Sequence, residues 1–482
     1  MANVIYHENI TNIKDCYQDT EYGRKWLHDK LGSYLINKMH IYTSNDHLFL
    51  YKESEGIFVQ NDYDILKAIQ FHVANAKDTF RKEVVKYCLI AAPEFRPQTN
   101  LNIIGCKDSA FNIETNEEIP YSSDLFLQHK ITAKYVANAY NESVDKFLDR
   151  ITQNNKQLRM LIEEMIGYCL YRTARYQKCF VLSGGGSNGK STLLDVIIEF
   201  LGTNNTSALS LKNLQDKFKV AQIKDKLANI NDDVSNERIV DTELFKKLVV
   251  GGEFEAEQKN KNPFKMRNFG TIILSANEIP KSSDKTEGYF RRFIFIPLKA
   301  RFGADLPDYD PNILDKLITE NAKSYLLNLA IAGLKRLKAN GRFTETEETK
   351  KEFTEYKEDN DPLFAFFNEY EITSVEGKTT DYIRDKFNDW HKNEYGKSSE
   401  YKKTTITRWL KSYNYSTEIK RVNGEIKRVY IKEQNSGFGI TNNGSKSVTD
   451  SVTLCTQKGD KSVTLNPRPS LIPIEDDEEL PF

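Results

Sequence analysis

The octet Gly184-Gly185-Gly186-Ser187-Asn188-Gly189-Lys190-Ser191 decides the fold of the central part of this chain. It matches the pattern G-x-x-x-x-G-K-[ST], and it stands between an apolar run, Phe180 to Leu182, and an amphipathic one, Leu193 to Leu201. This order predicts a strand, a glycine-rich turn and a helix. Glycines let backbone N–H groups point at phosphate oxygens, and the start of a helix adds positive charge. The octet therefore predicts a phosphate-binding loop.

The side chains of this loop have separate expected roles. Lys190 is expected to reach the β- and γ-phosphates of ATP, and Ser191 to ligate Mg²⁺. ATP and Mg²⁺ are therefore the predicted cofactors. The residues expected to hold the nucleotide are Gly184, Gly185, Gly186, Ser187, Asn188, Gly189, Lys190, Ser191 and Thr192.

Further apolar runs follow the loop, at Leu227 to Ile230, Thr271 to Leu274 and Phe293 to Ile296. Because they alternate with amphipathic stretches, they predict an α/β fold, a parallel sheet with helices on both faces. One helix from about Pro311 to Asn340 is expected to close this unit.

Two of these runs end in polar side chains. Asp232 and Asp233 follow the first, where carboxylates can hold Mg²⁺ and polarise the attacking water, although acids after a strand commonly only cap a helix or form a turn. Asn277 follows the second, where an amide can orient water at the γ-phosphate. Ser191 and Asp232 are the expected metal ligands, and Lys190, Asp232, Asp233 and Asn277 are expected to be catalytic.

Composition indicates a soluble protein of several domains, because 482 residues with 39% hydrophobic and 28% charged side chains can bury a core. No stretch approaches the roughly 18 apolar residues of a membrane span, so a cytoplasmic protein without a membrane partner is expected. The six cysteines show no CxxC spacing, which argues against a disulfide framework and a zinc ribbon. The net charge of −1 gives no overall preference for nucleic acid, so partners must be sought region by region.

Patterns along the chain divide it into five expected parts. They are a mixed α/β N-terminal domain (1–115), a helical collar (116–172), the P-loop core (173–345), a basic helix–hairpin domain (360–432) and a disordered, acidic-tipped tail (433–482).

The motifs taken together resemble a known family. The octet, Asp232-Asp233, the segment from Gly251-Gly252 to Asn268, Ser275 to Pro280, and Gly288 to Phe293 stand in the order and spacing of a superfamily 3 AAA+ helicase. Within that superfamily, the chain is similar to the branch of phage and plasmid primase-helicase C-terminal type. Phe111 to Glu114, Ile119-Pro120 and Phe147 to Asp149 resemble its preceding helical domain, and Leu326 to Phe343 its closing helices, so the resemblance covers about residues 45 to 345. The chain looks most like the replication initiator-helicases of Gram-positive pathogenicity islands.

This resemblance implies a ring, usually a hexamer, in which each ATP lies between subunits. An arginine from the neighbouring subunit then stabilises charge on the transferring phosphoryl group, and Arg292 or Arg291 stands at that position. A lone subunit should accordingly hydrolyse ATP poorly. Two adjacent arginines before a strand can also be simply solvated.

The family also places a hairpin in the ring channel. Here Phe254 to Gln258 and Phe264 to Phe269 can pair around a basic turn. Cations on it can hold the phosphates of single-stranded DNA without reading sequence, and an exposed basic turn is the alternative. The expected contacts are Lys259, Lys261, Lys265 and Arg267.

The segment after Gly377 predicts a winged-helix domain that binds origin duplex DNA. Two helices are followed by strands that meet at Asn423-Gly424, a pair that favours a two-residue hairpin turn. Nine Lys or Arg against two acids between Tyr401 and Lys432 suit a phosphate backbone, although a solvated or protein-docking surface is the alternative. The expected contacts are Thr405 and Arg408 in the major groove and Lys420, Arg421, Lys427 and Arg428 on the backbone.

The chain ends in Glu475 to Glu479 followed by Leu480-Pro481-Phe482. This tip resembles the C-terminal tip of bacterial single-stranded DNA-binding proteins, which implies docking to a host replication protein. A solubilising acidic tail is the other interpretation.

Three other functions compete with a DNA helicase that initiates replication of a mobile element. A nicking nuclease needs a His-x-His pair, which none of the seven histidines forms. A primase-helicase needs paired metal-binding acids; Asp62 and Asp64 have the spacing, but they directly precede a predicted helix and are interpreted as its cap. An ATP-switched origin-binding protein without unwinding stays open.

Overall fold

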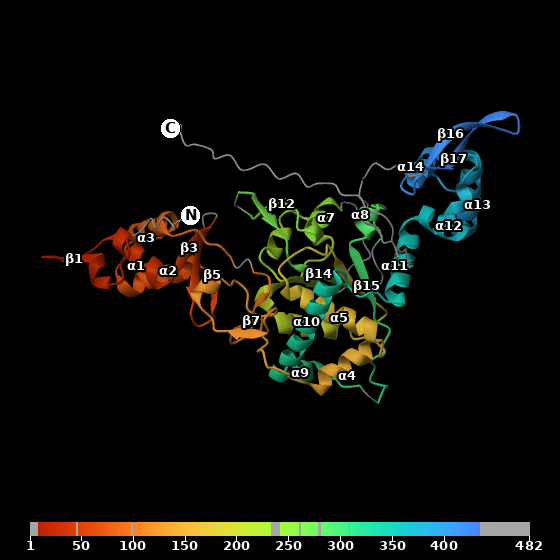
Figure 1. The fold of residues 1–482 in the computed structure, drawn as a ribbon. Helices are drawn as coiled ribbons and strands as arrows, with labels where there is room; N and C mark the ends of the chain where they lie inside the picture. The colour runs from red at the N-terminus through yellow and green to blue at the C-terminus, as the bar shows by residue number, and fades with distance from the viewer. Residues whose placement is uncertain are drawn as a thin grey trace, which may run out of the picture. The chain divides into compact units, whose positions relative to one another are not determined.

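The computed structural model describes residues 8–44, 47–97, 100–232, 242–259, 262–277, 281–307 and 309–433 (Figure 1). Three predictions of the sequence analysis lie outside these residues, namely the roles of Asp233 and Lys261 and the acidic-tipped tail from residue 434 onward.

A five-stranded sheet forms the centre of the fold. Its order is β10-β11-β14-β9-β15, and every neighbouring pair is parallel. The predicted parallel sheet is therefore confirmed, and it is consistent with a P-loop core. The strands are β9 (Cys179–Ser183), β10 (Thr206–Ser207), β11 (Ala228–Asn231), β14 (Thr271–Ala276) and β15 (Phe293–Pro297).

Both faces of this sheet are buried, because successive side chains along each strand point to opposite sides. Phe180 and Leu182 of β9 enter one hydrophobic core, and Cys179 and Val181 enter the other. The first core is completed by α4 (Glu142–Ile151), α5 (Lys156–Leu170), α6 (Lys190–Leu201) and α10 (Glu320–Asn340); the second by α7 (Glu243–Val250), α8 (Glu287–Phe290), α11 (Glu347–Asn360), β12 (Glu253–Ala256) and β13 (Phe264–Arg267).

Helices α5 and α10 pack at backbone distance. A Cβ atom at Gly167 would overlap the carbonyl oxygen of Ala330, and one at Gly333 would overlap the backbone of Glu163. Only glycine fits at these two positions, so the crossing depends on both.

Charged side chains tie these helices together. The carboxylate of Glu164 is fully buried, and it accepts hydrogen bonds from Arg336 Nε at 2.7 Å and from the backbone N–H and hydroxyl of Thr344, both at 2.7 Å. Arg159 at the start of α5 pairs with Asp145 at 2.5 Å and with Asp149 at 2.6 Å, both on α4. The two ion-pair groups hold α4, α5 and α10 as one helical layer.

The single helix predicted from about Pro311 to Asn340 is wrong. The chain forms α9 (Ile313–Leu317) and then α10, because the hydroxyl of Thr319 accepts a hydrogen bond from Ala322 N at 3.2 Å and caps a new helix. The segment before α9 contacts the glycine-rich loop, where the backbone N–H of Phe302 donates to the carbonyl of Ser187 at 2.6 Å.

The N-terminal part contains helices and strands, with a core of its own around Leu31, Leu50 and Ile65. Its elements are β1 (Tyr17–Thr20), β2 (Gly23–Trp26), α1 (His28–Lys38), β3 (Ile41–Ser44), β4 (His47–Lys52), β5 (Ile57–Gln60), α2 (Asp62–His72) and α3 (Asp78–Ala91). Strands β6 (Ile103–Gly105), β7 (Ala110–Asn112) and β8 (Glu117–Ile119) follow, and Ile104 and Phe111 belong to the first core of the central sheet. Asp62 and Asp64 lie in the first turn of α2, which Asn61 caps, and Asp64 pairs with Lys52 at 3.0 Å. The two acids therefore belong to the start of a helix, as predicted in outline, but the cap itself is Asn61 and neither Asp62 nor Asp64.

The C-terminal part packs around Phe366, Phe387 and Tyr430. Asn423 and Gly424 have φ values of 52° and 86°, as a type I′ turn requires, so the predicted hairpin is present. The elements are α12 (Pro362–Tyr370), α13 (Thr380–Tyr395), α14 (Lys403–Lys411), β16 (Tyr415–Val422) and β17 (Glu425–Lys432).

Short 3₁₀ helices occur at Ile13–Cys16, Ser123–Leu125, Thr203–Asn205, Asn213–Gln215, Val220–Ile223 and Ile372–Val375. Across the part of the chain that the structure describes, none of the helices combines the length and apolarity of a membrane span.

Candidate functional site

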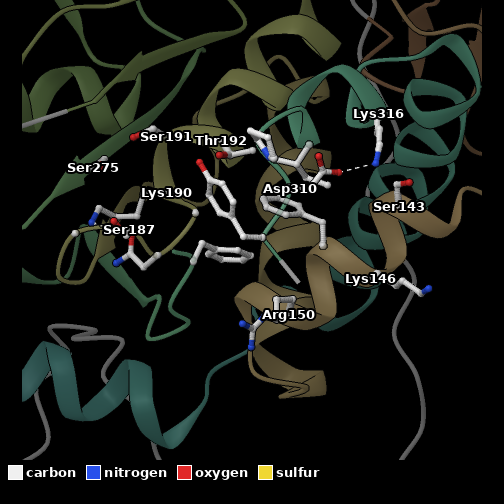
Figure 2. Close-up of a pocket in the computed structure, with 18 of the residues that line it drawn as sticks. Ser143, Lys146, Arg150, Ser187, Lys190, Ser191, Thr192, Ser275, Asp310 and Lys316 are labelled. Carbon is white, nitrogen blue, oxygen red and sulfur yellow. Dashed lines mark hydrogen bonds and ion pairs between the residues drawn. The ribbon is translucent and has the colours of Figure 1, made fainter. Parts of the chain in front are cut away.

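The phosphate loop connects β9 to α6 and holds its lysine in place (Figure 2). Lys190 Nζ donates to the carbonyl oxygens of Gly184 at 2.6 Å and Gly185 at 3.2 Å, and to Asn188 Oδ1 at 3.2 Å. Burial lowers the pKa of Lys190, and the charge of Asp232 opposes that shift. The ammonium group thus lies inside the curve of the loop, bonded to neutral oxygens that a phosphate can replace.

Two glycines of the loop are required by its shape. Gly184 has a φ of 148°, and a Cβ there would overlap Asn188 Nδ2 and the carbonyl oxygen of Leu298. Gly189 has a φ of 85°, and its Cβ would lie 3.0 Å from the ring of Phe302. Gly185 and Gly186 have open space, so only the first and last glycines of the octet are fixed by packing.

The ends of β11 and β14 bring two further predicted residues to this loop. Asn277 Oδ1 accepts a hydrogen bond from Lys190 Nζ at 3.1 Å, and Asp232 lines the same cavity. The contacts arise because parallel strands place their carboxyl ends at one edge of the sheet. The cavity has a volume of about 840 Å³.

Ser191 and Asp232 line this cavity together and offer a hydroxyl and a carboxylate oxygen. Oxygen donors of this kind suit Mg²⁺, which proteins hold through one or two carboxylates together with substrate phosphates and water. No cluster of three His, Cys, Asp or Glu exists within the described residues, so nothing there forms an all-protein metal cage. The residues present fit a metal that arrives with a nucleotide.

The two candidate arginines, Arg291 and Arg292, lie at the amino ends of the parallel strands, whereas the loop lies at their carboxyl ends. They directly precede β15, which runs parallel to β9 with Phe293 beside Cys179 and Pro297 beside Ser183. Five strand residues, about 16 Å at roughly 3.3 Å each, therefore separate them from their own phosphate loop.

Arg291 and Arg292 differ in environment. Arg291 is exposed. Arg292 is only 8% exposed, and its Nε and Nη1 atoms have no hydrogen-bond partner among the residues that the structure describes. Burial lowers the pKa of Arg292, and the charge of Asp284 opposes that shift. A buried guanidinium with N–H groups of this kind can gain hydrogen bonds from a bound anion.

Strands β12 and β13 form the expected hairpin, with Glu253 opposite Arg267 and Ala256 opposite Phe264. Lys265 pairs with Glu253 at 3.2 Å and Arg267 with the same carboxylate at 3.9 Å. Lys259, near the turn, is exposed. The charges of Lys265 and Arg267 are thus partly balanced by Glu253, and all three described cations of the hairpin are exposed to solvent.

An exposed aromatic residue next to this hairpin was not predicted from the sequence. Phe218 is 59% exposed, and its backbone N–H donates to Asp216 Oδ1 at 2.8 Å, which fixes the turn. The carbonyl of Lys217 accepts from Glu257 N at 3.0 Å and ties this turn to the end of β12. The sequence does contain a signal for this residue, because Phe218 stands between Lys217 and Lys219 in the stretch Asp-Lys-Phe-Lys. An aromatic side chain among cations is typical of surfaces that bind single-stranded nucleic acid.

In the C-terminal part, Thr405 and Arg408 are exposed on α14, whereas the hydroxyl of Thr407 lies 3.0 Å from the hydroxyl of Tyr430. On the hairpin, Lys420 pairs with Glu418, and Lys427 pairs with Glu425 at 2.7 Å. Arg421 and Arg428 are exposed.

Comparisons with known proteins give sequence and fold relatives. Residues 182–292 match the model of a family of unknown function (DUF5906). The "Putative helicase L207/L206" of Acanthamoeba polyphaga mimivirus is 24% identical over 247 residues, which are 47% of this chain and 25% of that protein. This chain therefore matches about a quarter of the length of that relative.

Among solved structures, the A-form apo structure of the NrS-1 C-terminal region has a TM-score of 0.52 at 14% identity, covering 84% of this chain and 98% of that one. A second apo structure of the region, residues 305–718, has a TM-score of 0.49 at 15% identity over the same shares of the two chains. At such identity the likeness concerns the fold alone. The chain is thus similar in sequence to a putative helicase and in fold to the NrS-1 C-terminal region.

Proposed function

We propose that this chain is an ATP-driven DNA helicase of the superfamily 3 type, which initiates replication of a mobile element as a ring, usually a hexamer. The observation that carries the proposal is the 3.1 Å contact of Lys190 with Asn277 in a cavity that Asp232 also lines. The homology to a putative helicase supports it. The narrower likeness to initiator-helicases of Gram-positive pathogenicity islands rests on motif order in the sequence.

In this proposal each polar group of the cavity acts on one part of ATP. Lys190 exchanges its carbonyl partners for the β- and γ-phosphates, which frees the Oδ1 of Asn277 to orient the attacking water. Ser191 and Asp232 hold Mg²⁺, which neutralises charge on the phosphates when bound. Asp233 is assigned to the polarisation of water from the sequence pattern alone.

The remaining requirement is a cation at the γ-phosphate, and Arg291 and Arg292 of the same chain are about 16 Å from it by strand length. Lys146, Arg150 and Lys316 of the chain itself line the cavity, and we propose, from the family that the motifs resemble, that a neighbouring subunit supplies the arginine at the γ-phosphate. Arg292 is our choice over Arg291, because its Nε and Nη1 atoms, which have no partner among the described residues, would gain partners from a phosphate. This requirement is the reason for proposing a ring.

Two surfaces are proposed to bind DNA. Single-stranded DNA lies on the hairpin, where Lys259, with Lys261, holds phosphates and Phe218 stacks on a base. Origin duplex is held by Thr405 and Arg408, with Lys420, Arg421, Lys427 and Arg428 on its backbone. The tail after residue 433 is proposed to dock on a host replication protein through Leu480-Pro481-Phe482, on the strength of its sequence.

The decisive test is Lys190→Ala, with Lys156→Ala at the exposed start of α5 as the matched control. We expect Lys190→Ala to abolish ATP hydrolysis and strand displacement on a forked duplex while leaving duplex binding in a gel shift intact. Unwinding at the wild-type rate in Lys190→Ala would refute the phosphate-loop assignment. If the wild-type protein hydrolyses ATP on DNA but separates no strands, the chain is an ATP-switched origin-binding protein instead.

A further inference from the structure

The cavity extends beyond the phosphate loop. Figure 2 shows Ser187 and Lys190 on one side of it and Asp310 and Lys316 on the other. That second side is made by α4, by the segment between β15 and α9, and by the start of α9. Its lining residues are Ser143, Lys146, Phe147, Arg150, Phe302, Tyr309, Asp310, Pro311, Ile313 and Lys316. Half of these side chains are aromatic or apolar and half are polar or charged, whereas the loop opposite is polar.

Phe302 forms a fixed part of this wall. Its backbone N–H donates to the carbonyl of Ser187 at 2.6 Å, and its ring lies against Gly189. The guanidinium carbon of Arg150 lies 5.4 Å from the centre of the ring, on the side of α4. With the phosphate loop on one side and Arg150 on the other, Phe302 packs as core rather than as a free stacking surface.

Tyr309 differs from Phe302 in exposure. It lines the same cavity, yet 46% of it is open to solvent. Exposed aromatic rings of this kind stack on nucleobases, and one such contact typically raises affinity by about 10-fold. The cavity lining therefore includes an exposed aromatic ring next in sequence to Asp310.

Asp310 provides the polar group beside that face. Its Oδ2 accepts from Lys316 Nζ at 2.6 Å, and its Oδ1 accepts from Asn312 N at 3.0 Å. The hydrogen bond from Lys316 lowers the pKa of Asp310, so the group is a carboxylate at neutral pH and can only accept hydrogen bonds. An exocyclic amino group is the matching donor, and the ammonium of Lys316 can donate to an adjacent ring nitrogen.

We propose that Tyr309, Asp310 and Lys316 form the nucleobase subsite. Adenine stacks there on Tyr309, and its exocyclic amino group donates a hydrogen bond to the carboxylate of Asp310. The inference rests on the proposed function, since it takes the phosphate loop as the triphosphate site. It adds that the base is selected by the segment before α9, which carries no recognisable nucleotide motif.

The first test separates the base from the phosphates by comparing ATP with inorganic tripolyphosphate in calorimetric titrations of the full chain. Tyr309→Ala should weaken ATP binding about 10-fold and leave tripolyphosphate binding unchanged, whereas Tyr309→Phe should keep both. Lys190→Ala should weaken both ligands. Equal loss of ATP and tripolyphosphate in Tyr309→Ala, or no loss of either, would overturn the subsite; unchanged binding of both ligands by Lys190→Ala would overturn the proposed function instead.

The second test is a double-mutant cycle on the amino group. Wild-type protein should bind ATP about 10-fold more tightly than the analogue whose purine lacks the 6-amino group, as expected for a hydrogen bond to a charged acceptor. In Asp310→Ala the two ligands should bind within about 2-fold of each other. An undiminished preference for ATP in Asp310→Ala would show that another group reads the base. Tripolyphosphate binding by Asp310→Ala, compared with wild type, checks that the loop is intact.

Discussion

Replacing Gly184 by alanine should remove nucleotide binding, although the change adds a single methyl group. The new Cβ would lie well inside 3.0 Å of both Asn188 Nδ2 and the Leu298 carbonyl oxygen, and the φ of 148° belongs to a region that side chains rarely adopt. Backbone strain costs about 1–3 kcal/mol and overpacking about 1–3 kcal/mol. The sum, about 2–6 kcal/mol, corresponds to a loss of affinity of at least about 30-fold if the loop relaxes to relieve it.

The measurement is the dissociation constant of a fluorescent ATP analogue, with thermal unfolding as a check on the fold. Gly185→Ala is the matched control, because its Cβ would meet nothing within 4 Å, and we expect its affinity to stay within about 3-fold of wild type. Wild-type affinity in Gly184→Ala, or equal loss in both variants, would show that the packing of the loop does not set its binding.

Three further outcomes are expected. Arg292→Ala should lower ATP turnover by about a thousandfold. Mixing this variant with Lys190→Ala subunits should restore ATP hydrolysis at the interfaces that join an intact Arg292 to an intact Lys190. No recovery of hydrolysis in the mixed assembly would contradict a role of Arg292 between subunits. Glu164→Leu should lower the free energy of unfolding in urea by about 1–3 kcal/mol, because the backbone N–H and hydroxyl of Thr344 lose their acceptor and Arg336 keeps only Glu163 as a carboxylate partner. Glu142→Gln, in an exposed pair, should change nothing. Similar unfolding curves for the two variants would argue against the buried pair. A chain ending at Asp361 should keep ATPase stimulation by single-stranded DNA and lose duplex preference, and an unchanged gel shift at fixed salt would exclude α14 and its hairpin as the duplex surface.

The position of the glycine-rich loop and of the residues around it was predictable because the signals are local. Apolar runs of three or four residues mark β9, β11 and β14, and parallel strands bring their ends together whatever the intervening sequence. Asn277 could thus be placed beside Lys190 without knowledge of any contact.

Features that depend on distant packing were not predictable. Two adjacent acids in a helix are normally read as surface, yet Glu163 and Glu164 are buried because Arg336, 172 residues beyond Glu164, reaches both. The break before α10 was not predicted, because the helical spacing of apolar residues continues through it. The sequence alone did not show that Thr319 is the N-cap of a new helix. Tyr309 and Asp310 carry no pattern of their own, so their place in the cavity lining became known only from the structure.

The glycine contact between α5 and α10 also determines how the molecule can move. Because the two backbones touch at Gly167 and Gly333, neither helix can slide along the other without a carbonyl group climbing over the next turn. The ion pair of Arg159 with Asp145 joins α4 to the packed pair of α5 and α10. Helix α4 also forms one wall of the cavity. The cavity wall on α4 is therefore held in one rigid group with the whole of α10, whose 21 residues span about 30 Å at roughly 1.5 Å each.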